Sequence, residues 1–190
     1  MRRNLLVAGL LTSLLATGLS ACTRDDPAAA PAPDAGRDVA SAPPAWNPCS
    51  GLDVDPVSRL FAATYSVRLG TPDAPTCTFA PLTDGDPLVD VNYQTYPGSL
   101  AELLRTFGAQ EQPGRTRVIA PRVPGADDAR LIVDASADTL AVTGFVRNGL
   151  LVQILNLLDP RPYDRAQLLR AAERLMADLA ANADSSGLTR

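Results

Sequence analysis

The chain has 190 residues, and 21 acidic against 17 basic residues give it a net charge of −4. It contains no histidine and no lysine, which excludes Ser-His-Asp and Cys-His catalysis, imidazole-based zinc sites and lysine Schiff bases. The acidic balance argues against nucleic-acid binding, which depends on neutralising phosphates.

The N-terminus has the features of an export signal. Arg2 and Arg3 precede an apolar run, Leu5 to Leu19, that is too short for a membrane span of about 20 residues. The run ends in Leu19-Ser20-Ala21-Cys22, which resembles the bacterial lipobox. We expect a signal peptide over 1–21 and a lipid (palmitate) anchor on Cys22, which would hold the protein on the extracytoplasmic side of the cell membrane. The export route, general or twin-arginine, stays open.

Residues 22–45 consist largely of Ala, Pro and Asp. They show no apolar periodicity, and their prolines favour an extended spacer between the anchor and the domain. We expect a single globular domain over 46–184 and a frayed tail over 185–190.

The first predicted element is a short N-terminal helix. Asp55-Pro56, with Asp53 before it, is typical of a helix start, and Val57, Leu60 and Phe61 fall on one helical face. Residues 69–72 end the run, and 77–79 form a short apolar strand.

The middle of the chain predicts a strand and a helix. Apolar residues alternate with Asp90, Asn92 and Gln94 over 89–95, as in a half-buried strand with one solvated face. Ser99 and Glu102 form a capping box that opens a middle helix, and Gly108 is its predicted stop. The apolar face of this helix consists of Leu100, Leu103, Leu104 and Phe107.

Further strands are predicted over 117–120 and 129–133, followed by a hairpin. Asn148-Gly149 is the residue pair of a type I′ turn between two apolar segments, 139–147 and 150–158. The predicted register pairs Arg147 with Leu150, Phe145 with Val152 and Thr143 with Ile154.

A long amphipathic helix from about Asp164 closes the chain. Its predicted apolar stripe comprises Leu168, Ala172, Leu175, Met176 and Leu179. Together these elements predict an α+β domain: an antiparallel sheet of about five strands, with the N-terminal, middle and C-terminal helices packed mainly on one face.

Two cysteines remain beside Cys22. In an oxidising compartment, Cys49 and Cys77 favour one disulfide, and a redox pair or a metal site is the alternative.

The block Asn47-Pro48-Cys49-Ser50-Gly51-Leu52, followed by Cys77-Thr78-Phe79, resembles a group of actinobacterial lipoproteins, the domain of unknown function 3558 family. Phe79 stands where tryptophan is more familiar in that family. The resemblance covers roughly 46–180 and implies an envelope lipoprotein with one disulfide. It supplies no catalytic or binding residues.

One face of the predicted hairpin is a candidate ligand or partner surface. It carries Phe145, Leu150, Val152 and Ile154, and Trp46 is a further candidate contact where spacer meets domain. The alternative is that the N-terminal helix or the Trp46 segment covers this face. The sequence favours coverage, because apolar residues of this kind mostly lie in cores.

The acidic turns Asp84-Gly85-Asp86 and Asp127-Asp128 are candidate cation sites, and a polar turn is the better interpretation of each. We therefore predict no metal, cofactor or catalytic residue.

The predicted function is a non-enzymatic binding or interaction module of the cell envelope, attached to the membrane through its lipid. Its ligand would be an unknown protein or an apolar envelope molecule. The alternatives are a carboxylate-based envelope hydrolase and an accessory subunit of an envelope complex.

Overall fold

The computed structural model describes residues 46–107 and 111–190. The predicted signal peptide, Cys22, the spacer and the predicted helix stop Gly108 lie outside these ranges. No helix in the described ranges is long and apolar enough to cross a membrane.

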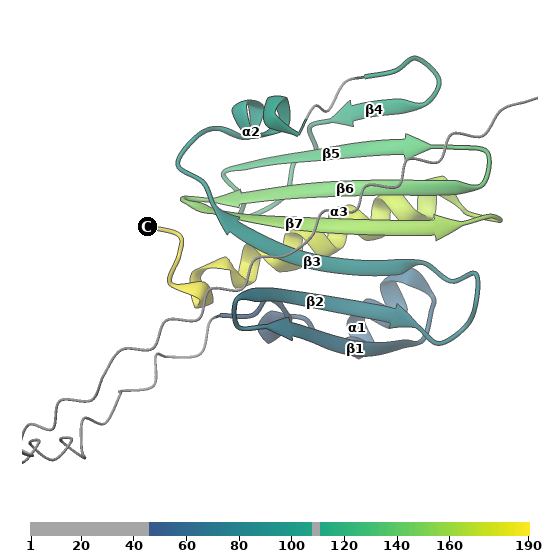
Figure 1. Cartoon of the computed structure of the whole chain (residues 1–190), viewed down its shortest axis with the longest axis horizontal. Coiled ribbons are helices and arrows are strands. Elements are labelled where there is room, and N and C mark those ends of the chain that lie inside the picture. Colours follow the sequence, from purple (N-terminus) through teal and green to yellow (C-terminus); the bar gives the residue numbers. More distant parts are fainter. Residues whose placement is uncertain (1–45, 108–110) are drawn as a thin grey trace, which may run out of the picture. The chain divides into compact units, whose positions relative to one another are not determined.

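Within the described residues, a seven-stranded antiparallel sheet forms the centre of the domain (Figure 1). Its strands are β1 (Tyr65–Thr71), β2 (Ala74–Pro81), β3 (Leu88–Thr95), β4 (Thr116–Ile119), β5 (Asp128–Ala135), β6 (Thr139–Asn148) and β7 (Leu151–Pro160). Their order across the sheet is β1-β2-β3-β7-β6-β5-β4. The chain leaves the middle of the sheet after β3, crosses to the β4 edge and returns strand by strand until β7 pairs with β3.

The predicted α+β class is confirmed, but the sheet has seven strands rather than about five. The sequence missed β1, the edge strand. Only Tyr65 of its residues is buried, so the alternation of apolar and polar residues that marks a half-buried strand is weak there.

The two helices α1 (Val54–Phe61) and α3 (Arg165–Asn182) cover the same face of the sheet, here named the α3 face, and lie behind the strands in Figure 1. The predicted stripe of α3 is confirmed, since all five of its residues are buried. Asp164 caps the helix by accepting from the Gln167 amide at 3.0 Å. Gly144 of β6 allows α3 to approach the sheet closely, because a Cβ at this position would lie 3.1 Å from Met176 Sδ of the helix.

The third helix, α2 (Leu100–Thr106), packs on the opposite face, here named the α2 face. The predicted capping box is present: Ser99 Oγ accepts from the Glu102 amide, and Glu102 Oε2 accepts from the Ser99 amide. The buried leucines of α2 pack on Phe145, Val152 and Ile154. The prediction that the helices lie mainly on one face is therefore wrong for α2, because the chain crosses the α2 face on its way from β3 to β4.

The hairpin β6–β7 is confirmed, but its register differs from the prediction by two residues. Asn148 pairs with Leu151 and Phe145 with Ile154, so the turn is Gly149-Leu150. Gly149 has φ +58°, while Leu150 is not among the positive-φ residues, which is the pattern of a type II′ turn rather than type I′. A shift of two residues keeps every side chain on its predicted face.

The predicted frayed tail differs as well. A 3₁₀-helix, η2 (Ala183–Ser186), follows α3 directly, and Thr189 Oγ1 donates to Asp184 Oδ1 at 3.3 Å. The Thr189 carbonyl fills the space that a side chain at Gly149 would need, so Thr189 lies against the hairpin turn.

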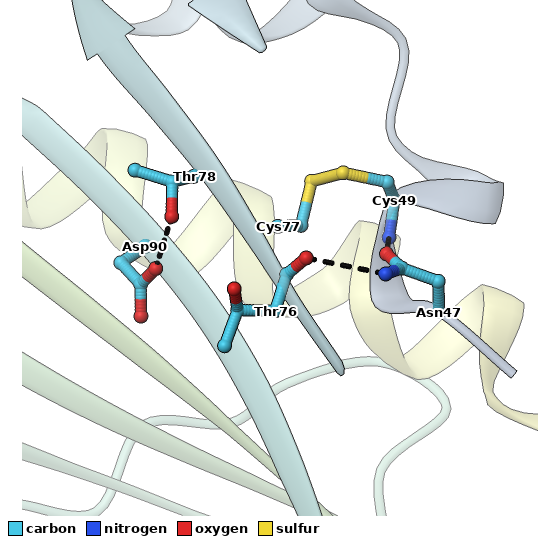
Figure 2. Close-up of a disulfide and its surroundings, with 6 residues drawn as sticks. All are labelled: Asn47, Cys49, Thr76, Cys77, Thr78 and Asp90. Carbon is cyan, nitrogen blue, oxygen red and sulfur yellow. Dashed lines mark hydrogen bonds between the residues drawn. A yellow bond between two sulfur atoms is a disulfide. The ribbon is translucent and has the colours of Figure 1, made fainter. Parts of the chain in front are cut away.

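The predicted disulfide joins Cys49 of the 3₁₀-helix η1 (Pro48–Gly51) to Cys77 of β2, with the two Cα atoms 5.1 Å apart (Figure 2). Asn47 reinforces the link. Its Oδ1 accepts from the Cys49 amide at 2.9 Å, and its Nδ2 donates to the Thr76 carbonyl at 3.2 Å. The start of the domain is thus fixed to β2 by one covalent and one polar bridge.

We expect the Cys49→Ser/Cys77→Ser variant to lose about 3 kcal/mol of unfolding free energy, since the disulfide closes a loop between residues 28 positions apart. Urea unfolding followed by the fluorescence of Trp46, which packs edge-on against Tyr93, measures this loss. Reduced wild-type protein should match the variant. A loss below about 1 kcal/mol would contradict the structural role of the bridge.

Candidate functional site

A groove of about 620 Å³ runs along the α2 face beside α2. Its floor comes from the central strands: Asn92 and Gln94 lie on β3, Asn156 on β7 and Thr143 on β6. Strand register explains the arrangement, because Asn92 pairs with Ile154 and Thr143 with Asn156, which places these side chains on one face. This volume falls within the range of small-molecule sites, about 300–1,000 Å³.

Polar groups dominate the floor of the groove. Four amide side chains line it: Asn92, Gln94, Gln112 and Asn156. The Thr143 hydroxyl donates to Asn156 Oδ1 at 3.4 Å, so the NH₂ of that amide remains for a ligand. Gln94 Nε2 is buried and has no hydrogen-bond partner within the described residues. A buried donor left unpaired costs about 1–3 kcal/mol, and a ligand could remove that cost only after the Gln94 side chain turns toward the groove, because this atom is not accessible as it lies.

The carboxylate of Asp134 is the acidic group of the groove lining, and it is already engaged. Its Oδ1 accepts from Arg115 Nε at 3.1 Å, and its Oδ2 accepts from Thr116 Oγ1 at 3.3 Å. No arginine lines the groove in the described parts of the chain. The groove therefore presents neutral hydrogen-bonding groups rather than a field of one sign.

One wall of the groove is apolar. Phe107, at the end of α2, is 55% exposed and packs against Phe145 with ring centroids 5.6 Å apart. Ile132 and Ile154 complete this wall. One side of the Phe107 ring thus contacts the protein while much of the ring remains open to solvent.

The structure does not bring the five predicted surface residues together. Phe145, Val152 and Ile154 are buried under α2, so they do not form an exposed apolar surface, although Phe145 and Ile154 line the groove. Leu150 lies in the hairpin turn and is 38% exposed. Trp46 packs on the opposite side, against Tyr93, and its Nε1 donates to Ser185 Oγ at 3.2 Å. Coverage of the hairpin face is thus correct, but α2 rather than the N-terminal helix or Trp46 provides it.

Sequence reasoning missed most of the groove. Asn92 and Gln94 were recognised only as a solvated strand face. Asn156, a polar residue within the apolar segment LLVQILNLL, was the available signal. Its partners Gln112, Thr116 and Asp134 lie on other elements and could not be assigned to it from sequence.

The acidic turn Asp127-Asp128 has structural roles. Asp127 Oδ2 accepts from the Gly149 amide at 2.7 Å and so supports the hairpin turn, while Asp128 forms an ion pair with Arg130. In residues 46–107 and 111–190, no group of three or more Cys, Asp or Glu side chains is placed to hold a metal ion.

A second, smaller pocket of about 150 Å³ lies on the α3 face and is lined by three carboxylates, Asp86, Asp159 and Asp164. Asp159 of β7 is only 8% exposed. Burial raises its pKa, and the neighbouring Asp86 carboxylate raises it further. Asp164, the third acid of the lining, is occupied as the cap of α3.

An apolar stretch is exposed at the β1 edge of the sheet. Val67 is 41% exposed and Leu69 is 66% exposed. β1 pairs with β2 on one side only, so its other side presents unpaired backbone groups. Such an edge is a possible site of strand pairing with another chain.

Comparison with known protein families, curated proteins and solved structures finds no match to this chain. The family resemblance described above therefore stays a prediction.

We expect Asp159→Asn to stabilise the protein more at pH 7 than at pH 3. A raised pKa means that the folded state binds the proton more tightly than the unfolded state, so this carboxylate costs stability as the pH rises above its ordinary value of 3.8. An asparagine stays neutral throughout. Urea unfolding of wild type and variant at each pH gives their difference in unfolding free energy. Titratable groups that both proteins share cancel from this difference.

Asp84→Asn is the control, because Asp84 is exposed in the loop that carries Asp86 and does not line the pocket. If the stability difference between Asp159→Asn and wild type were the same at both pH values, or more favourable at pH 3, the effect would be contradicted.

Proposed function

We propose that this protein is a lipid-anchored lipoprotein on the extracytoplasmic side of the cell membrane, and that it acts as a non-enzymatic binding module. The observation that carries the binding role is the groove on the α2 face. It combines four amide side chains, an exposed aromatic ring and a volume suited to a ligand. The lining is more polar than the apolar ligand predicted from the sequence would need.

The lipobox-like block ending in Cys22 supports the anchor, and the Pro/Ala-rich spacer would separate the domain from the membrane surface. The net charge of −4 gives little attraction to anionic lipid, so attachment would depend on the acyl chains.

The hydrolase alternative would use Asp86 and Asp159, the carboxylates that share a pocket. That pocket, at about 150 Å³, is smaller than typical ligand sites and would admit no sugar ring beside the water that an inverting pair needs. The accessory-subunit alternative would use the β1 edge with Val67 and Leu69.

We expect Cys22→Ala to abolish labelling by a palmitate analogue and to shift the protein from the membrane fraction, because the thiol is the proposed acylation site. Fractionation of cells that express each protein measures the shift. The Cys49→Ser/Cys77→Ser variant serves as the control, since it removes both disulfide cysteines of the domain but should leave labelling unchanged. Equal labelling of wild type and Cys22→Ala would contradict the anchor.

The groove is tested with a photo-reactive benzoylphenylalanine at Phe107 in the full chain, expressed in cells. Phe107 is exposed at the groove wall, so we expect an adduct on irradiation. The same residue at Leu82, which is 65% exposed and outside the groove, is the matched control. No adduct at Phe107, or the same adduct at both positions, would refute ligand binding in the groove. The photo-reactive residue is also placed at Val67 on the β1 edge. An adduct there and not at Phe107 would favour the accessory-subunit alternative.

A further inference from the structure

We propose that the ligand of the groove is an uncharged oligosaccharide. This inference rests on the proposed function, since it names the class of molecule that the same groove binds. It follows from three properties of the groove: the type of its polar groups, the absence of a free charge among them, and the position of Phe107.

The polar groups match hydroxyl-rich ligands. A carboxamide offers two donors and one acceptor side by side, so it can donate to and accept from neighbouring hydroxyls of one sugar ring. Asn92 and Gln94 occupy alternate positions of β3 on the same face, and Asn156 lies on the adjacent strand. The Thr143–Asn156 hydrogen bond orients one of these amides in advance. Such a set of fixed amides selects for ligands with many neutral hydroxyls.

The described part of the groove has no free charge, and this disfavours anionic and cationic ligands. Asp134 is held by Arg115 and Thr116, and no arginine lines the groove within the described ranges. An anionic ligand would lose its hydration shell without gaining a counter-charge. A cation would have to displace Arg115 from Asp134. An uncharged ligand meets neither cost.

A peptide fits the groove less well than a sugar. Extended peptides usually bind by adding a strand to an open sheet edge. Of the strands that form this floor, β7 and β6 are paired on both sides, while β3 pairs with β7 along its length and with β2 over Val89–Asn92, so most of the backbone groups under the groove are already bonded. The groove therefore offers side chains alone, which suits a ring decorated with hydroxyls.

The exposed ring of Phe107 supplies the apolar contact that a sugar requires. A pyranose has polar edges and a less polar face of C–H groups, and that face packs against aromatic rings. Phe107 packs against Phe145 with ring centroids 5.6 Å apart, and it lines the groove together with the amide side chains. The edge of a sugar ring can thus meet the amides while its face meets Phe107.

The test uses the full chain in a detergent without a sugar head-group. We titrate it with uncharged trisaccharides of glucose, mannose, arabinose and N-acetylglucosamine, and record the side-chain NH₂ signals of Asn92, Gln94 and Asn156 by NMR. Trigalacturonic acid and a capped trialanine serve as charged and peptide probes. We expect at least one uncharged trisaccharide to shift these signals in a saturable way, and neither other probe to do so.

Two variants place the binding in the groove. Phe107→Ala should weaken binding of that trisaccharide about tenfold, because it removes one aromatic contact. Leu82→Ala, another exposed apolar truncation, should leave binding unchanged. Asn156→Asp keeps the acceptor for Thr143 but removes the amide donors, and it should weaken binding by at least as much. Because Phe107 is exposed, its variant keeps the test valid even if the change at Asn156 disturbs the strand.

The source of the sugar is resolved by comparing the bound trisaccharide with its polymer. Tighter binding of the polymer would support an envelope glycan strand, and equal binding would support a free short oligosaccharide. If no uncharged trisaccharide moves the amide signals, or if Phe107→Ala binds as well as wild type, the proposal is overturned. A light-dependent adduct at Phe107 without any sugar binding would overturn this inference alone and leave the binding role in place.

Discussion

The pairing of β3 with β7 is the interaction on which the rest of the domain depends. It joins residues 88–95 to residues 151–158 through eight consecutive partners, and it unites two units that are otherwise formed by local pairing. The first unit is the hairpin β1–β2 extended by β3, and the second is the run β4 to β7. Because the contact is distant in sequence, its formation costs more chain entropy than the hairpins do.

The same junction creates the groove. Once β3 lies in the middle of the sheet, the chain must cross one face to reach the β4 edge, and α2 forms within that crossing. α2 buries the apolar end of the face, where its three leucines meet Phe145, Val152 and Ile154. The remaining part of the face carries Asn92, Gln94, Thr143 and Asn156 side by side, which turns polar residues of three strands into one lining.

The α3 face, unlike the α2 face, is closely covered by a helix. α3 fits closely over Gly144, and the buried Gln153 donates through Nε2 to the Leu179 carbonyl at 2.9 Å, which ties β7 to the helix. The disulfide and Asn47 fix η1 to β2 beside this core. A sheet whose one face is sealed and fixed in this way gives a rigid floor to the groove on its other face. Rigid floors favour binding because few side chains must be ordered when a ligand arrives.

The sequence by itself determined the elements whose signals are local. The capping box of α2, the apolar stripe of α3, the hairpin around Gly149 and the Cys49–Cys77 pair were all predicted, because caps, periodicity and turn residues act within a few positions. The register of the hairpin, the edge strand β1 and the face that α2 covers were decided only in the tertiary structure. Each of these depends on which strands become neighbours. A strand such as β1, which buries one side chain, has too weak an alternation of apolar and polar residues to be predicted from sequence. The groove belongs to the same group, since Gln94, Asp134 and Asn156 become one site only through the pairing of strands far apart in the chain.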